Sequence, residues 1–316
     1  FVTQMEEVMG ECLDKNIKVV SNAGGLNPQG CADAVQEIAD RLGLNPSIAY
    51  VAGDDLAPRL TELIEAGNDF AHLDTGESLG DLVDRIVTAN AYIGCWGIVE
   101  ALDQGADIVV TGRATDAAVV AGPAAWYHGW QRDDWDALAG AIVAGHVIEC
   151  GGQATGGNYS FFTEIEDLTY PGFPWADVYA DGTSIIGKHE DTGGEVSIGT
   201  ITSQLLYEIQ SERYFNPDVV SRFDTIQLEE VERDRVKISG TRGEPAPKQL
   251  KVAMNYQGGF RNQISIGLTG LDIEAKAELI ERQFWNSCPY DPEDYESVVR
   301  KYLPTHKQNP GTNEEA

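Results

Sequence analysis

Short apolar segments alternate with segments of helical periodicity through the first 150 residues, and this alternation constrains the fold more than any other feature. Strands are predicted at 17–20, 48–51 and 107–110. Helices are predicted at 31–42, 58–66, 91–104 and 133–145, with a polar loop over 67–81. A helix between two strands returns the chain to the start of the next strand, so such strands pair in parallel. The sequence therefore predicts an α/β fold with a parallel sheet.

The pattern changes after about residue 160 to β-branched segments bounded by turn residues such as Asp181-Gly182 and Gly193-Gly194. These segments predict antiparallel strands, followed by an amphipathic helix over 271–285. The predicted strands are 176–186, 195–201, 225–229, 235–239, 250–255 and 263–268. We therefore predict an α/β domain over residues 1–160, a smaller α+β domain over 161–303, and a disordered tail over 304–316.

The charge of the chain argues against nucleic acid as a partner. Its 316 residues include 51 acidic and 22 basic residues, which give a formal net charge of −29. No basic patch is available to neutralise phosphates, and the acidic residues are spread along the chain, as is typical of a solvated surface. No apolar segment approaches the roughly 18 residues of a membrane span, so no membrane partner is expected.

The five cysteines, at positions 12, 31, 95, 150 and 288, are widely spaced. An odd count without a CxxC pair indicates reduced thiols in a cytoplasmic protein, rather than disulfides or a structural zinc site. The sequence contains nothing that resembles a signal peptide. The chain begins at Phe1 inside a helical pattern, which predicts that it is a fragment of a longer protein.

Polar loops follow all three predicted parallel strands. Ligands of open α/β sheets and of (β/α) barrels bind at the carboxyl ends of the strands. We therefore expect the loops 22–27, 54–55 and 111–116 to lie on one rim, where a ligand would bind.

The loop after the first strand reads SNAGGLNPQG over residues 21–30. Gly24 and Gly25 would allow a ligand to approach the bare backbone, Asn22 and Asn27 can each donate and accept, and the amides of the next helix attract anions. The alternative is a tight turn in which Asn27 caps the helix. The loop is neither GxGxxG nor a Walker loop, so the sequence has no NAD or FAD motif.

The other two loops carry charged residues. Arg113, in TGRATD, is predicted to hold a carboxylate or phosphate beside Asp116, and the alternative is an Arg113–Asp116 pair that only shapes the loop. Asp54 and Asp55 are candidate ligands for a divalent metal, and Asp55 is a candidate general base. The alternative for these two acids is a helix cap with a first-turn charge.

The glycine-rich segment over 145–158 carries His146, Glu149 and Cys150. These three residues would share one helix face, so we predict a His146–Glu149 acid/base pair. Cys150 is the weaker alternative as a nucleophile, because small buried cysteines are usually inert.

Five further residues complete the predicted site. Lys188 and His189 precede a glycine pair and are predicted to close over an anionic ligand, although a hairpin turn with exposed polar residues would give the same pattern. The predicted substrate-binding set also contains Asn90, Gln153 and Asn158.

Seven blocks of sequence together resemble the AtuA family, named for acyclic terpene utilisation in bacteria. The resemblance extends over nearly the whole chain. Family members begin with a further glycine-rich strand and helix, so the resemblance also implies an absent N-terminal segment. The blocks are VSNAGGLNP, TANAYIGCWGI, VVTGRATDAA, AGHVIECGGQATGGNY, KHEDTGG, SQLLYEI and GLTGLDIEAKAEL.

The resemblance implies a place in the degradation of citronellol, geraniol and related branched acyl-CoA compounds, and it supplies no cofactor. We predict a catabolic enzyme or enzyme subunit that performs hydratase, lyase or acyl-transfer chemistry on an anionic acyl or acyl-CoA substrate. A non-catalytic binding or scaffold subunit and a metal-dependent hydrolase are the alternatives. The sequence leaves both a homo-oligomer and a small partner subunit open.

Overall fold

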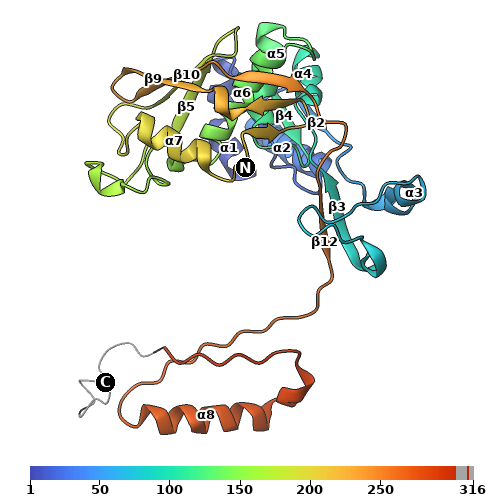
Figure 1. Cartoon of the computed structure of the whole chain (residues 1–316), viewed down its shortest axis with the longest axis vertical. Helices are drawn as coiled ribbons and strands as arrows, with labels where there is room; N and C mark the ends of the chain where they lie inside the picture. The colour runs from blue at the N-terminus through green and yellow to red at the C-terminus, as the bar shows by residue number, and fades with distance from the viewer. Residues whose placement is uncertain (304–311, 313–316) are drawn as a thin grey trace. The chain divides into compact units, whose positions relative to one another are not determined.

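The computed structural model describes residues 1–303 and 312, and it divides into two compact units, Phe1–Gln257 and Gly258–Ala316 (Figure 1). The domain boundary predicted near residue 160 lies within the first unit, so that division is not confirmed. The tail predicted over 304–316 lies outside the described residues, Thr312 excepted. In the second unit, α8 (Ile273–Ser287) agrees with the predicted helix.

The first unit contains the predicted parallel sheet. Its strands are β1 (Val19–Ser21), β2 (Ile48–Val51) and β4 (Ile108–Thr111), in the order β1-β4-β2. Ser21 pairs with Val110, and Val51 pairs with Thr111. The three strands therefore end at one edge, and the three polar loops leave the sheet side by side.

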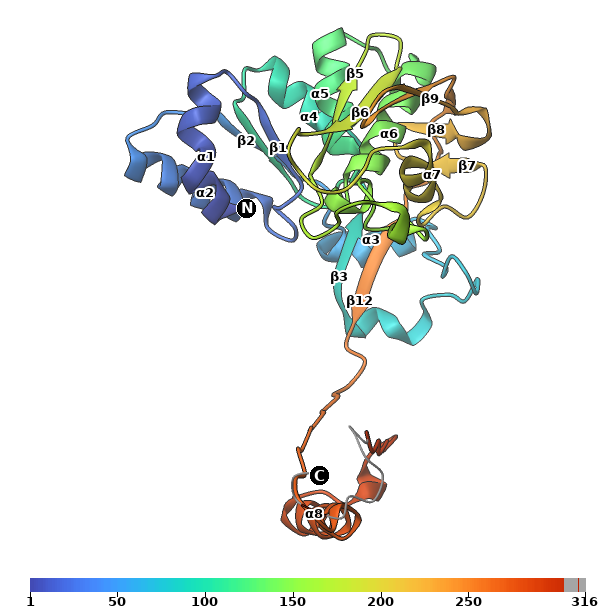
Figure 2. The same ribbon diagram turned by 90° about the vertical axis from the view of Figure 1, so that its left-hand side faces the viewer.

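Helices cover both faces of this sheet (Figure 2). On β4, Ile108 and Val110 pack with α1 (Val2–Asp14) and α2 (Pro28–Leu42), whereas Val109 packs with α4 (Trp96–Asp103). Successive side chains of a strand point to opposite faces, so an entirely apolar strand such as β4 is buried on both sides.

The helix α6 (Trp135–Ile148) lies at the centre of the first unit. All residues from Ala137 to Val147 are buried, and the helix packs against α5 (Ala118–His128), α7 (Ile198–Leu206) and strands of two antiparallel sheets. A helix that is apolar on every side needs such surroundings. One sheet has the order β5-β6-β10-β9 and the other β11-β8-β7.

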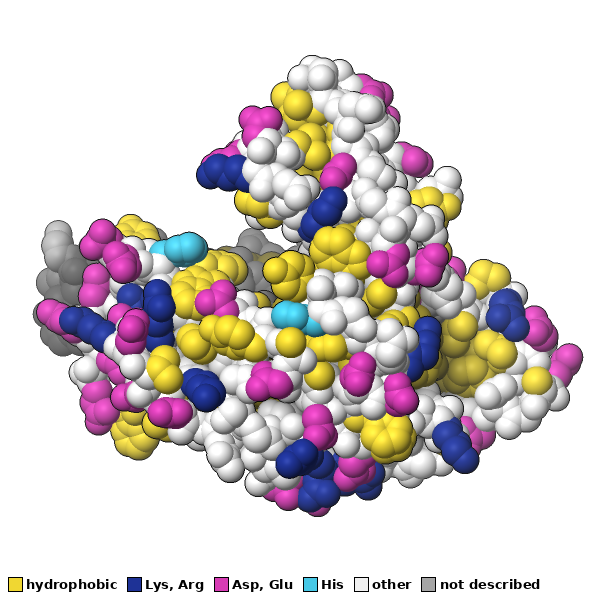
Figure 3. All heavy atoms as spheres, turned by 90° about the horizontal axis from the view of Figure 1, so that it is seen from above, with side chains coloured by type: hydrophobic (Ala, Val, Ile, Leu, Met, Phe, Trp, Pro, Cys, Tyr) yellow, Lys and Arg dark blue, Asp and Glu magenta, His cyan; other side chains and the backbone are white. Residues whose placement is uncertain are grey.

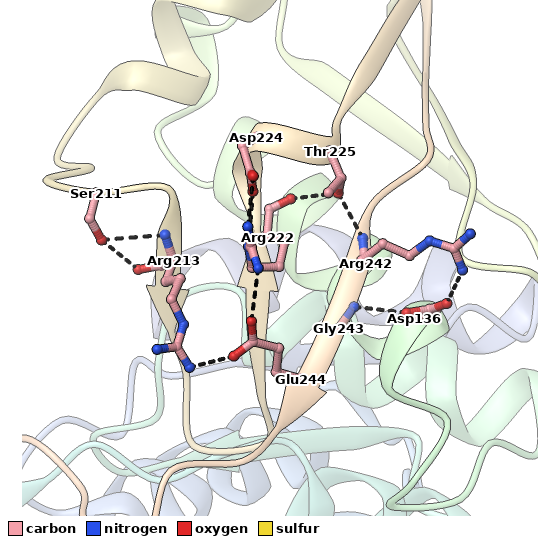
Figure 4. A network of polar contacts seen from close by, with 9 residues as sticks. All are labelled: Asp136, Ser211, Arg213, Arg222, Asp224, Thr225, Arg242, Gly243 and Glu244. Atoms are coloured by element: carbon pink, nitrogen blue, oxygen red, sulfur yellow. Dashed lines mark hydrogen bonds and ion pairs between the residues drawn. The ribbon is translucent and has the colours of Figure 1, made fainter.

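These antiparallel strands agree only in part with the prediction. Their bounds are β5 (Pro174–Val178), β6 (Ser184–Lys188), β7 (Arg213–Phe215), β8 (Val219–Arg222), β9 (Gln227–Glu232), β10 (Arg235–Ser239) and β11 (Arg242–Pro245). The sequence predicted the β5–β6 hairpin, β9 and β10, but not β7, β8 and β11. Hydrogen bonds and ion pairs connect β7, β8 and β11 to one another and to α6 (Figure 4). In α6, Asp136 accepts hydrogen bonds from Arg242 (2.6 Å) and from the Gly243 amide (2.8 Å).

Three sequence predictions were wrong. The segment 195–201 runs into the helix α7, which begins at Ile198, because Ser197 and Thr200 form a capping box that outweighs the β-branched composition. The segment 263–268 forms no strand. The helix predicted over 91–104 begins only at Trp96, since the preceding residues form β3 (Ile86–Ala91), which pairs with β12 (Val252–Tyr256).

Acidic side chains are distributed across the face shown in Figure 3, with basic side chains scattered among them. This distribution is what the sequence predicted for a solvated acidic surface. None of the helices over residues 1–303 is long and apolar enough to cross a membrane.

Gly24 is expected to contribute to stability, because the loop after β1 packs directly on the end of β4. A Cβ atom at Gly24 would lie 2.4 Å from the Thr111 carbonyl oxygen and 2.7 Å from Pro28 Cα. Gly24→Ala should lower the free energy of unfolding by about 1–3 kcal/mol. Gly10→Ala in α1, where the nearest atom lies at 3.9 Å, is the matched control and should be neutral or stabilising. Equal stability of the two variants in urea unfolding would contradict the packing argument.

Candidate acid–base site

Asp116 lies where the loops after β1 and β4 meet. Its Oδ1 accepts hydrogen bonds from Asn22 Nδ2 (2.9 Å) and from the Arg113 guanidinium (3.0 Å). Three predicted site residues therefore come together on the predicted rim. An Arg113–Asp116 pair that shapes the loop was predicted as the alternative to an anion-binding Arg113. The pair is present, and it also connects to Asn22, which follows the neighbouring strand β1.

The close packing of α5 and α6 brings Glu149 to the same place. Gly145 on α6 lies against Ala117, so that a Cβ there would be 2.8 Å from Ala117 Cα. Asp116 directly precedes Ala117, and Glu149 lies one helical turn after Gly145. The two carboxyl groups consequently lie close enough to interact.

Glu149 holds a proton near neutral pH in this environment. Burial is the largest cause, followed by the charge and hydrogen bond of Asp116 and the charge of Glu208, and together they raise the pKa of Glu149 to about 7. Two carboxyl groups in contact resist ionising together. The Asp116–Glu149 pair can therefore present one carboxylic acid and one carboxylate, which is the combination that general acid–base chemistry requires.

Three further residues complete what we call the acid–base cluster, defined as Asp116, Glu149, Cys150, Tyr207 and Glu208. Tyr207 and Glu208 directly follow α7, and their side chains lie close enough to interact. Burial, together with the charges of Glu149 and Glu208, raises the pKa of the Cys150 thiol. Because the thiolate is the reactive form, this environment argues against Cys150 as a nucleophile.

His146 lies beneath the cluster rather than in it. The ring is 2% exposed, its Nε2 lies 3.1 Å from the Gln204 carbonyl oxygen, and its Nδ1 lies 4.0 Å from Glu149 Oε1. Burial lowers the pKa of the imidazole. At 4.0 Å the ring and Glu149 are too far apart for a hydrogen bond, so the structure gives no hydrogen-bonded His146–Glu149 pair.

Two cationic side chains lie beside the Tyr92 ring, and one of them is Arg113, the partner of Asp116. The Arg113 guanidinium lies over the Tyr92 ring, 4.5 Å from its centroid, and Lys251 Nζ lies 5.1 Å from the same centroid. Arg113 Nε is buried without a hydrogen-bond partner. Two cations beside one ring, with a donor still free, form a suitable grip for a carboxylate or phosphate.

Buried polar atoms without a partner occur around the same residues. Within the described part of the chain they include Thr115 Oγ1, Gln153 Oε1 and Gln204 Nε2. A native structure pairs nearly all such groups with protein, water or ligand. Their concentration beside the acid–base cluster therefore indicates a place that accepts water or a polar ligand.

Sequence reasoning missed Tyr207, Glu208, Tyr92 and Lys251. Tyr207 and Glu208 lie in SQLLYEI, which was noted only as a block of family resemblance, and Tyr92 lies in TANAYIGCWGI. No strand-end or motif argument reaches residues that follow α7 or directly precede β12. For Tyr207, Glu208 and Tyr92 the blocks themselves were the available signal, whereas Lys251 lies in none of them.

Asp54 and Asn90 support the loops from inside the protein. Asp54 is 3% exposed, and its Oδ2 accepts hydrogen bonds from the Arg113 amide (2.7 Å) and from Asn90 Nδ2 (3.0 Å). Asp55 is exposed and accepts a hydrogen bond from the Ala57 amide (3.0 Å) in a turn, whereas the N-cap residue of the next helix, Leu56, has no side-chain cap bond. Residues 1–303 contain no group of three or more His, Cys, Asp or Glu side chains arranged to hold a metal ion.

The remaining predicted residues have local contacts. Asn27 caps α2 by accepting a hydrogen bond from the Gly30 amide (2.9 Å), Gly25 is exposed with φ of 51°, and the amide of Asn158 lies 3.4 Å from the Ser203 carbonyl oxygen. Lys188 lines a cleft of about 820 Å³ whose walls contain none of the acid–base cluster. His189 is exposed beside it, and only its carbonyl is engaged, by Thr192 Oγ1 (2.6 Å).

Asp54 is expected to contribute to stability rather than to metal binding. Asp54→Ala leaves the Arg113 amide and the Asn90 side chain without their acceptor, and it should lower the free energy of unfolding by about 2–4 kcal/mol. Asp55→Ala, which removes only an exposed turn contact, should lower it by about 1 kcal/mol or less. Urea unfolding with and without divalent cations checks both expectations, and a cation-dependent loss specific to either variant would favour the metal hypothesis.

Glu149 is expected to make the protein less stable as pH rises. The folded state binds the Glu149 proton more tightly than the unfolded chain does, so the stabilisation is complete below the ordinary pKa of 4.5 and is lost as pH rises through about 7. Glu149→Gln carries no such loss. Because the Glu149 side chain is 16% exposed, solvent screens part of this effect. The free energy of unfolding of Glu149→Gln, relative to that of the wild type, should therefore be about 1–2 kcal/mol higher at about pH 8 than at about pH 5. A constant difference in urea unfolding at the two pH values would show that Glu149 titrates normally.

Comparison with known proteins places this chain in a family. A model described as acyclic terpene utilisation family protein AtuA matches residues 1–316. No curated protein and no solved structure matches the chain. The match spans every segment that forms the acid–base cluster and the cations beside it. The chain belongs to the AtuA family of acyclic terpene utilisation proteins.

Proposed function

We propose that this protein is an enzyme of acyclic terpene degradation that adds or removes a proton, in a hydratase or lyase reaction, on an anionic branched acyl compound. The Asp116–Glu149 carboxyl pair carries the proposal, because burial of Glu149 and the charge of the exposed Asp116 raise the pKa of Glu149 to about 7. The family gives the metabolic setting. The substrate class and the reaction class are our inference from the residues.

Each residue has a defined part in this chemistry. Arg113 and Lys251 hold the anionic group of the substrate, as the two cations beside Tyr92. In the hydration direction, ionised Asp116 accepts a proton from water, and protonated Glu149 gives its proton to the carbon that becomes saturated. The net change is the addition of H and OH across a double bond, which consumes no other reactant. Asn22 holds Asp116 in place through its amide.

Acyl transfer through a cysteine is less well supported. The Cys150 thiol is held protonated by burial and by the charges of Glu149 and Glu208. In the non-catalytic alternative, Arg113 and Lys251 bind the same anionic group, but no reaction follows. Ligand binding with no conversion would therefore distinguish a binding subunit from an enzyme.

The test is conversion of a panel of unsaturated branched acyl-CoA thioesters and free acids by the full chain, followed by mass spectrometry. Glu149→Gln and Asp116→Asn should each lower kcat by about 10²–10⁴. The wild-type rate should fall as pH rises through about 7, because the proton donor is lost. Arg113→Lys should chiefly raise KM, by about tenfold, since it removes the forked donors but keeps the charge.

Glu212→Gln is the matched control, because Glu212 is exposed and belongs to the segment after α7. It should keep wild-type kcat and KM. Full activity of Glu149→Gln on a converted substrate would overturn the assignment of the carboxyl pair. Binding without conversion across the panel would favour the scaffold or binding-subunit alternative.

A further inference from the structure

The loop after β4 contains a buried hydroxyl group that lies outside the acid–base cluster. Thr115 Oγ1 is buried, and it has no hydrogen-bond partner among the described residues. A buried hydroxyl without a partner is costly, because folding removes it from water and gives no hydrogen bond in return. Native proteins usually pair such groups with water or a ligand. The hydroxyl of Thr115 can therefore donate to a ligand.

The backbone on both sides of Thr115 is extended and held in place. Ala114 forms a parallel bridge with Ile93. The Ile93 amide donates to the Arg113 carbonyl oxygen (3.0 Å), and the Thr115 amide donates to the Ile93 carbonyl oxygen (3.0 Å). Successive side chains of an extended segment point to opposite faces. Because Ala114 is fully buried in the core, Arg113 and Thr115 share the other face.

Arg113 contributes a second donor on this face. Its Nε is buried and also has no hydrogen-bond partner within residues 1–303, whereas a terminal nitrogen of the same guanidinium donates to Asp116 (3.0 Å). Residues two positions apart in an extended segment are separated by about 6.6 Å. The two oxygens of a carboxylate can each accept a hydrogen bond of about 3 Å from donors that lie this far apart. One carboxylate can therefore pair with both donors.

The surroundings of these two donors favour an anion. Arg113 Cζ lies 4.5 Å and Lys251 Nζ lies 5.1 Å from the centroid of the Tyr92 ring, so two positive charges are close by. The Nε–H of Arg113 can only donate, and a cation would offer it no acceptor. Thr115 directly precedes Asp116, so a group bound here lies beside the acid–base cluster.

We propose that Thr115 is a further substrate-binding residue, whose hydroxyl donates a hydrogen bond to a carboxylate of the substrate beside the Nε–H of Arg113. The two donors match the two oxygens of a carboxylate, and hydrogen bonds to a charged acceptor are the stronger ones. A thioester carbonyl has one oxygen and no charge, so a free carboxylate fits this place better. This inference rests on the proposed anionic substrate, and it names the anionic group that the loop binds.

The stability of the unliganded protein is the first test. Valine has nearly the shape of threonine without the hydroxyl, so Thr115→Val removes a buried group that has no partner and should keep or raise Tm. Thr155→Val is the matched control. The Thr155 hydroxyl is also buried, but it donates to the Gly172 carbonyl oxygen (2.7 Å), so its loss should lower Tm. A similar fall of Tm in both variants would show that the Thr115 hydroxyl is paired within the protein, and it would overturn the inference.

Binding of 3-methylbut-2-enoate, a small branched carboxylate, to the full chain is the second test. In isothermal titration calorimetry, Thr115→Val should raise the dissociation constant by about tenfold or more, because a hydrogen bond to a charged group is lost. Thr115→Ser keeps the hydroxyl and should bind nearly as tightly as the wild type. The neutral amide of the same acid should bind more weakly than the acid.

The outcomes separate this inference from the proposed reaction. Equal affinity of Thr115→Val and the wild type, tighter binding of inorganic phosphate than of the carboxylate, or no carboxylate binding at all would overturn the inference. Conversion of a substrate by Thr115→Val with an unchanged KM would also overturn it, while the proposed reaction would stand. Carboxylate binding that depends on Thr115, without conversion of any substrate, would support the inference and count against the proposed enzyme activity.

Discussion

The burial of α6 on every side is the constraint on which the rest of the first unit depends. A helix from Ala137 to Val147 without an exposed face must be surrounded, and α5, α7 and two antiparallel sheets surround it. Its contact with α5 is close because residue 145 is glycine. The same contact fixes the end of α6, so the packing of the core determines where Glu149 lies.

The polar network depends on this apolar packing. Asp116 at the start of α5 meets Glu149 at the end of α6 only because Ala117 and Gly145 touch. Asp54 then holds the Arg113 amide from below, and Asn22 holds Asp116 from the neighbouring strand exit. Burial in these surroundings also gives Glu149 its raised pKa, so the core supplies both the position and the chemistry of the acid.

Much of the parallel half was predictable because its signals are local. The strands β1, β2 and β4 are short apolar segments with turn residues after them, and parallel pairing places their ends at one edge. Asn22, Arg113 and Asp116 were expected on one rim for this reason, and they meet there. The segment 195–201 was wrongly predicted as a strand from its β-branched residues. Its capping box involves only two residues, whereas the β-branched composition extends over the whole segment.

The sequence by itself determined the family, the parallel sheet and the rim from which Asn22, Arg113 and Asp116 project. These follow from periodicity, turn residues and long sequence blocks, all of which are properties of neighbouring residues. Tertiary structure alone decided that Asp116 lies close enough to Glu149 to help raise its pKa, that Asp54 is a buried acceptor, and that Tyr207 and Glu208 join the cluster. The physical reason is that hydrogen bonding and desolvation depend on which segments are packed together, and residues such as 116, 149 and 208 are distant in the chain.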